Sequence, residues 1–296
     1  MATNHDNAPP ILGVIGGSGI YDVEGLSDVR WEAVDTPYGN PSDELMFGTL
    51  DGLPVVFLPR HGRGHRVPPS DLNFRANMYA LKYAGVTEVV SLSAVGSLRE
   101  DLVPGTFVVV DQFIDRTFAR VKSFFESGLV AHVSMANPVC CRLGNHIEAA
   151  ARDLDINVVR GGIYLVMEGP QFSSRAESEL YRSWGCSVIG MTNMPEAKLA
   201  REAELCYATV AMVTDFDCWH EDHDDVTVDQ IIGTLISNAG KGRSLVRALA
   251  RQLELREAPC EQGCHTSLDN AIITAPEARD PEVVERLATI VGRTLG

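Results

Sequence analysis

The sequence has no apolar run that approaches the ~18 residues a membrane-spanning helix needs. Its first ten residues carry neither the basic stretch nor the apolar stretch of a secretory signal peptide. Basic residues are few, since 25 Lys and Arg stand against 40 Asp and Glu and give a formal net charge of −15. Non-specific binding to nucleic acid requires the opposite sign. These absences predict a cytoplasmic protein that binds neither a membrane nor a nucleic acid.

Repeated C-x-x-C pairs are also absent. The seven cysteines are scattered, at positions 140, 141, 186, 206, 218, 260 and 264, so a zinc ribbon is disfavoured and no metal site is expected. Four of them lie in or beside apolar segments, where a free cysteine behaves as a small hydrophobic residue. Cys260 and Cys264 lie in a polar segment and could form a disulfide, although a reducing compartment disfavours it. The sequence leaves their state open.

The apolar pattern indicates an α/β fold. Short buried strands are expected at 11–15, 55–58, 88–92, 107–111, 158–166, 188–191 and 210–213, and helices at 73–83, 137–154, 175–184, 195–203, 227–253 and from 280 onward. No linker precedes residue 257. We therefore expect a disordered tail at 1–10, one domain over 11–256 with a central sheet flanked by helices, and a linker and helix at 257–296 packed on that domain.

Chemistry-bearing residues follow the predicted strands, and ligands of open α/β folds bind at the carboxyl ends of strands. Five such ends carry Ser18, Arg60-His61, Ser93-Ala94, Met191-Thr192 and Asp215 with Asp217. The first four offer hydroxyls, backbone amides and cations, which suit an anion. The Gly-Gly-Ser-Gly turn at 16–19 could also be a simple tight turn. It is not a dinucleotide fingerprint, because Asp22 stands where the third glycine should be, so a dehydrogenase is disfavoured.

Asp215 and Asp217 could belong to a solvated turn after a core strand. In extended chain, however, they lie on the same side, about 6–7 Å apart, and burying them is costly unless something pairs with them. A carboxylate accepts a hydrogen bond from the N6 amino group of a 6-aminopurine, and a protonated carboxyl can donate to its N7. An anion and an amine-bearing ring side by side fit phosphate and a purine nucleoside.

Several motifs make a resemblance specific: V-I-G-G-S-G, T-P-Y-G-N-P-S-D, R-H-G-R-G-H, S-A-V-G-S-L-R-E, D-Q-F-I-D-R-T, M-E-G-P-Q-F-S-S-R-A-E-S and M-V-T-D-F-D-C-W. Together they resemble the purine nucleoside phosphorylase family, and within it the branch that acts on methylthioadenosine. The match runs from about Ile11 to Leu249, and the sequence after about Arg251 matches poorly. The resemblance implies the nucleoside phosphorylase fold, with a mixed central sheet. It also implies phosphorolysis, in which phosphate is a co-substrate and no metal or organic cofactor takes part.

The resemblance also implies roles for individual residues. Phosphate would be bound by Ser18, Arg60, His61, Ser93, Ala94 and Thr192. Phe172 and Met191 would line the base and ribose, Ser173 and Val228 would set specificity, and Asp215 and Asp217 would hold the purine. The 6-oxopurine branch carries asparagine at the position of Asp215, so aspartate favours adenine.

An apolar wall is expected at the 5′ end of the nucleoside, formed by Val228, Ile231 and Ile232 on the helix after Thr227. Burial alone would favour a methylthio group over a hydroxyl there by roughly 1–3 kcal/mol. His132 resembles a histidine that the family supplies from a neighbouring subunit, although it could be a surface-loop histidine. The family pattern implies a trimer or a dimer of trimers. The alternatives are a phosphorylase of inosine or guanosine, and a non-catalytic nucleoside-binding protein.

Overall fold

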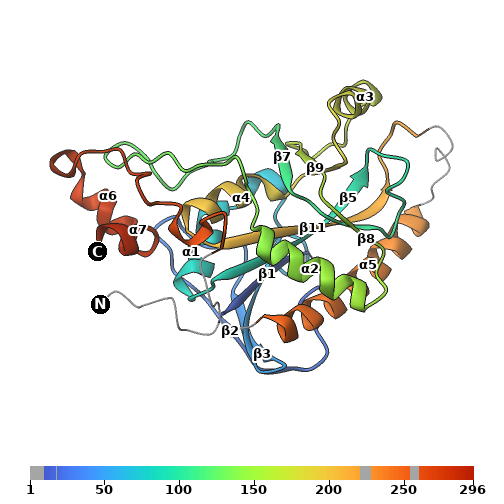
Figure 1. The fold of residues 1–296 in the computed structure, drawn as a ribbon, viewed down its shortest axis with the longest axis horizontal. Coiled ribbons are helices and arrows are strands. Elements are labelled where there is room, and N and C mark those ends of the chain that lie inside the picture. Colours follow the sequence, from blue (N-terminus) through green and yellow to red (C-terminus); the bar gives the residue numbers. More distant parts are fainter. Residues whose placement is uncertain (1–9, 18, 221–227, 254–259) are drawn as a thin grey trace.

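The computed structural model describes residues 10–17, 19–220, 228–253 and 260–296 (Figure 1), and of residues 228–232 it describes the main chain. Nearly all of the predicted tail at 1–10 and the predicted phosphate ligand Ser18 thus lie outside the described residues. The side chains of Val228, Ile231 and Ile232 lie outside them as well. In the described part of the chain, no helix combines the length and apolarity that a membrane crossing requires.

The centre of the molecule is a mixed sheet (Figure 1). Its strands are β1 (Leu12–Gly16), β2 (Leu26–Glu32), β3 (Leu45–Leu50), β4 (Leu53–Pro59), β5 (Glu88–Ser97), β6 (Phe107–Val109), β7 (Gln112–Asp115), β8 (Val158–Arg160), β9 (Ile163–Val166), β10 (Val188–Gly190) and β11 (Cys206–Phe216). The strands β4, β1, β5 and β11 are neighbours and parallel, so their carboxyl ends meet at one edge. β10 pairs with the end of β5 in the antiparallel sense.

Helices cover both faces of this sheet. The described helices are α1 (Phe74–Tyr83), α2 (Cys141–Asp153), α3 (Arg175–Ser183), α4 (Asn193–Glu202), α5 (Val228–Gln252), α6 (Pro281–Arg286) and α7 (Ala288–Leu295), of which α3 projects away from the sheet (Figure 1). Helices α1 and α4 pack on one face, and α2 and α5 on the other (Figure 1). The mixed sheet with flanking helices confirms the predicted fold class.

The burial of β11 on both faces explains why the central strands are continuous apolar runs in the sequence. Tyr207 and Ala211 point into the core beneath α1 and α4, whereas Ala208 and Val210 point into the core beneath α2 and α5. Side chains of a strand alternate between its faces, so a strand covered on both faces is apolar at nearly every position. The same alternation holds in β4.

Several predicted boundaries differ from the structure. β5 runs as far as Ser97, so Ser93 and Ala94 lie within the strand and not after it. The strand predicted at 158–166 is interrupted at Gly161 and Gly162, whose φ angles of +87° and +137° side chains rarely adopt. The predicted C-terminal helix is divided at Leu287 into α6 and α7.

The C-terminal segment packs against the residues that precede it. Leu287 and Ile290 are buried in the same core as Phe74 of α1. The Thr289 hydroxyl donates to the hydroxyl of Tyr79 at 2.8 Å. These contacts place the segment beside α1, on the side of the molecule opposite to α3 (Figure 1).

Candidate active site

The pairing of strands is interrupted along one edge of β5. On one side of this strand, β1 pairs with it as far as Ser91 and β10 pairs with it from Gly96 onward. The residues between, 92–95, therefore have no strand partner on that side within the described ranges. Ala94 is exposed there, although most of β5 is buried. Such a gap at the carboxyl ends of parallel strands is the usual position of a ligand in this architecture.

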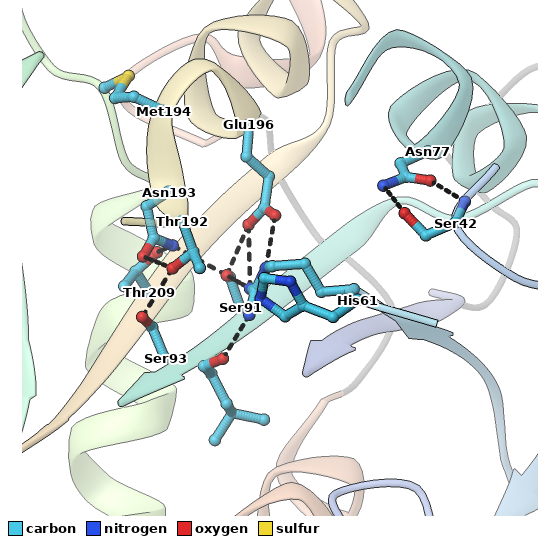
Figure 2. A network of polar contacts seen from close by, with 12 residues as sticks. Ser42, His61, Asn77, Ser91, Ser93, Thr192, Asn193, Met194, Glu196 and Thr209 are labelled. Atoms are coloured by element: carbon cyan, nitrogen blue, oxygen red, sulfur yellow. Dashed lines mark hydrogen bonds and ion pairs between the residues drawn. The ribbon is translucent and has the colours of Figure 1, made fainter. Parts of the chain in front are cut away.

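Arg60 directly follows β4, and it is only 2% exposed. Its Nε donates to Glu196 at 3.1 Å, its Nη1 to the Leu92 carbonyl at 2.9 Å and its Nη2 to the Ser91 hydroxyl at 2.5 Å. Figure 2 shows Ser91 and Glu196 in this network, between β5 and α4. The guanidinium fork thus engages Glu196, a pairing that makes burial of the charge tolerable. The direct role of Arg60 toward phosphate remains a prediction.

The other arginines of the R-H-G-R-G-H motif do not join Arg60. Arg63 is exposed and binds Asp43 at 2.7 Å and Glu44 at 2.8 Å. Arg66 lies 3.7 Å from Asp43. Although the motif contains three arginines, they do not form one cationic cluster, because acidic residues of the 43–44 loop pair with the outer two.

His61 is neutral in this setting. Burial, followed by the charge of Arg60, lowers the pKa of His61 to about 4. Its Nδ1 lies 2.9 Å from the Val67 carbonyl, and a carbonyl can only accept, so Nδ1 carries the proton. The Nε2 atom is then a hydrogen-bond acceptor, which suits a protonated phosphate oxygen.

Two hydroxyls meet at the gap in the sheet. Ser93 Oγ lies 2.8 Å from Thr192 Oγ1 and 2.9 Å from the Tyr164 hydroxyl. Thr192 lies two residues after the end of β10, beside Ser93 in the polar network of Figure 2. The structure therefore brings together Ser93 and Thr192, as the strand ends predicted.

Asp215 lies in β11 and Asp217 just after it, beside the end of β5 that borders the gap. Asp215 pairs with Gly96 after a bulge at Thr214, and the backbone N–H of Asp217 donates to the Ser97 carbonyl at 3.0 Å. A Cβ placed on Gly96 would lie 3.3 Å from Asp215 Oδ1 and 3.4 Å from Asp217 Cβ. The two acids thus border the same glycine, in agreement with the sequence-based expectation that they lie on one side.

Both carboxyls favour their protonated form more than usual. Burial raises the pKa of Asp215, the Thr214 hydroxyl at 2.6 Å lowers it, and the charge of Asp217 raises it again. Burial likewise raises the pKa of Asp217, while the Ser178 hydroxyl lowers it. Among the described residues, Asp217 Oδ2 is buried without a hydrogen-bond partner. The site thus offers one polar atom that a ligand with N–H donors would satisfy.

The segment after β9 lies next to the two acids. The Cys218 thiol donates to the Ser173 carbonyl at 3.3 Å, and the Ser173 hydroxyl lies 3.5 Å from Met167 Sδ. Met191 packs against Gly169. Phe172, by contrast, is 83% exposed, so within one chain its ring is not packed against the other site residues.

His132 lies apart from these residues. It is exposed, on the loop between β7 and α2, and its backbone N–H donates to the Ala271 carbonyl at 2.9 Å. That loop runs beside the C-terminal segment, away from the carboxyl ends of β5 and β11 (Figure 1). Within one chain the structure does not bring His132 to Asp215.

Three residues of the site were missed from the sequence. Glu196 neutralises Arg60, and the fully buried Tyr164 binds Ser93. Arg120 donates to the Met191 carbonyl at 2.7 Å and to the Glu168 carbonyl at 2.8 Å, so it positions both segments that border the gap. Helical periodicity gives no signal for a buried glutamate, and the D-R-T motif before Arg120 marks only an irregular loop.

The fold and this arrangement agree with comparisons to known proteins. The family model described as the phosphorylase superfamily matches residues 11–251, and the chain belongs to this family. Its relatives include the S-methyl-5′-thioadenosine phosphorylase of Rhodospirillum rubrum, 63% identical over 287 residues that cover 97% of this chain and 98% of the relative. The enzyme of the same name from Bradyrhizobium diazoefficiens is 60% identical and covers 96% and 98%.

Solved structures give the same result. A methylthioadenosine phosphorylase from an Antarctic soil metagenomic library superposes with a TM-score of 0.90 at 45% identity, covering 95% of this chain and 99% of that chain. A variant of the adenosine/methylthioadenosine phosphorylase of Schistosoma mansoni, in complex with methylthioadenosine, has a TM-score of 0.78 at 34% identity and covers 96% and 98%.

Proposed function

We propose that this chain catalyses the phosphorolysis of S-methyl-5′-thioadenosine to adenine and 5-methylthioribose 1-phosphate, a step of purine and methionine salvage. The observation that carries the proposal is the position of the Asp215 carboxyl, whose pKa is raised, beside Gly96 at the gap where the Ser93 and Thr192 hydroxyls meet. Relatives with more than half of their residues identical carry this activity in their names.

The reaction would proceed by attack of a phosphate oxygen on C1′ while the bond from C1′ to N9 breaks. The electrons of that bond pass to the purine, and Asp215 donates its proton to N7. Asp217 accepts from the N6 amino group. The oxygens of phosphate would be held by the predicted ligands Ser18, Arg60, His61, Ser93, Ala94 and Thr192. Holding the nucleophile against C1′ supplies much of the rate, without a metal or organic cofactor in the chemistry.

The remainder of the nucleoside would be enclosed by Phe172 and Met191 at the base and ribose, with Ser173 and Val228 setting specificity. The wall of Val228, Ile231 and Ile232 would receive the methylthio group. We propose that the enzyme is a trimer in which His132 of a neighbouring subunit completes this end. The exposure of His132 and its separation from Asp215 in one chain support that placement. A cytoplasmic location is supported by the seven free cysteines.

The direct test is release of adenine from methylthioadenosine with and without phosphate, with inosine as the comparison substrate. We expect phosphate-dependent release and little turnover of inosine. Turnover of inosine instead would keep the phosphate site and overturn the assignment of the base. Binding of nucleoside without any turnover would favour a nucleoside-binding protein.

A further inference from the structure

Four cysteines from three separate segments converge at one buried point, which we call the cysteine cluster. Cys140 precedes α2, Cys206 opens β11, and Cys260 and Cys264 flank a turn of the C-terminal segment. Their sulfur atoms all lie within 4.8 Å of one another, and none of the four residues is more than 5% exposed. Two of these segments lie inside the region matched by the family model, and the third lies beyond it.

The spacing of the sulfurs fits tetrahedral coordination of one ion. Four thiolates that each lie about 2.3 Å from a common zinc ion stand about 3.8 Å from one another. Cys206 Sγ and Cys260 Sγ are 3.9 Å apart, whereas a disulfide needs about 2.05 Å. A cluster of several iron ions would need wider spacing, because metal and sulfide ions fill the space between the thiolates.

The surroundings of the cluster suit thiolates. The backbone N–H of Cys264 donates to Cys260 Sγ at 3.1 Å, and Arg201 Nη1 donates to Cys264 Sγ at 3.3 Å. Nδ1 of His265 lies 3.8 Å from Cys260 Sγ. A divalent ion with four thiolates leaves a net negative charge, which a buried guanidinium offsets. Such donors around the sulfur atoms are typical of the outer shell of a metal site.

We propose that the cysteine cluster binds one Zn²⁺ ion in a closed, structural site. Each thiol loses its proton to solvent on binding, and each sulfur donates a lone pair to the ion. Four protein ligands leave no open position for substrate. Cys206 and Asp215 stand near opposite ends of β11, about 30 Å apart along an extended strand. The ion therefore joins the C-terminal segment to the sheet and takes no part in phosphorolysis.

The first test measures metal in the full-length protein, purified without chelators, by inductively coupled plasma mass spectrometry. We expect one zinc ion per chain. We also expect the amount of zinc released to rise in proportion to the amount of mercurial reagent that reacts with the thiols. Exchange with Co²⁺ should give the visible absorption bands of a tetrahedral thiolate complex. Protein that holds no zinc and takes up none from solution would overturn the proposal. So would a mass that is lower by two hydrogens for each disulfide, or iron in place of zinc.

Substitution of single cysteines tests which of them bind the ion. Cys264→Ser should lose the zinc and the cobalt spectrum, whereas Cys141→Ser, which changes the exposed neighbour of Cys140, should retain both. Equal zinc content in the two variants would overturn the assignment. If Cys264→Ser does not fold, the mercurial titration of the unmodified protein still decides the question, since it needs no variant.

Discussion

In the proposed mechanism, the choice of base depends on Asp215. An asparagine amide at this position would donate to O6 or N7 of a 6-oxopurine, but it cannot deliver a proton. We expect Asp215→Asn to lower kcat/KM for methylthioadenosine by about 10²-fold or more and to raise activity on inosine relative to it. Steady-state kinetics on both substrates measure the shift.

The matched control is Asp101→Asn, which makes the same chemical change at an exposed carboxylate paired with Arg99. It should leave both activities unchanged. Unaltered base preference in Asp215→Asn would mean that another group protonates the purine.

Single residues of the site differ in how far the sequence could predict them. Ser93, Thr192 and Asp215 could be predicted, because the carboxyl ends of neighbouring strands meet at one edge whatever the details of packing. Glu196 could not be, since its partner Arg60 lies 136 residues away and local pattern carries no information about such pairs. The cysteine cluster was missed for the same reason: ligand spacing along the chain describes a compact motif, whereas these cysteines come from distant segments.

The contact between β4 and α4 depends on the buried pair of Arg60 and Glu196. Replacing Glu196 with glutamine leaves the Arg60 charge buried without a counter-charge, which costs about 3–5 kcal/mol of unfolding free energy. Phosphate bound beside Arg60 would restore part of it. We therefore expect urea unfolding to show that loss, and phosphate to raise Tm more in Glu196→Gln than in the unmodified protein.

Glu179→Gln provides the comparison, because its pair with Arg182 is on the surface of α3 and is worth at most about 1 kcal/mol. Losses of similar size in the two variants would show that the buried pair does not join the two elements. If phosphate raised the Tm of Glu196→Gln and of the unmodified protein equally, Arg60 would not be a phosphate ligand.

The end of α4 carries a pH-dependent contact with the loop before α2. Glu202 accepts from the backbone N–H of Phe124 at 2.7 Å and from the Ser123 hydroxyl at 2.8 Å, and burial raises its pKa to about 7 from an ordinary 4.5. The folded protein thus binds this proton more tightly than the unfolded chain does. Binding of this proton contributes on the order of 3 kcal/mol to the free energy of unfolding. The contribution is complete below pH 4.5 and is lost as pH rises through about 7.

Glu202→Gln keeps the accepting oxygen and removes the titration. We expect its unfolding free energy to vary less between pH 4.5 and 7 than that of the unmodified protein, as urea titrations at several pH values would show. The exposed Glu277→Gln should follow the unmodified protein. If the unfolding free energies of the unmodified protein and both variants changed with pH in the same way, the pKa of Glu202 would lie near its ordinary value.

The elements themselves were predictable to different degrees. Most of the strands buried on both faces have continuous β-branched runs and were predicted, as were the helices with an apolar stripe. β3 and β7 were not predicted. β2 was missed because most of its residues are exposed, so it has no apolar pattern to recognise. The length of β5 was underestimated, because its last residues are the serines and glycine that face the site.

The proposed trimer gives a prediction for the whole molecule. If each site combines Asp215 of one subunit with the partner subunit's His132, mixed trimers of Asp215→Asn and His132→Ala chains contain some intact sites. We expect co-refolded mixtures, assayed at low methylthioadenosine concentration, to exceed the mean activity of the two parents. Separately refolded proteins, mixed afterward, serve as the control. Activity equal to the mean would place His132 outside the neighbour's site.

The position of β11 also bears on how the chain is made. This strand lies between β5 and β6 at the centre of the sheet, yet it follows both by about a hundred residues in the sequence. Contacts between such distant segments form slowly, because a long loop must close first. A ribosome-bound chain that ends before residue 206 would expose the apolar edge of β5 and have only one side of its purine site. Nascent chains of this protein therefore depend on protection from aggregation until late in synthesis, and the carboxyl of Asp215, the proposed proton donor, is synthesised with the strand that completes the fold.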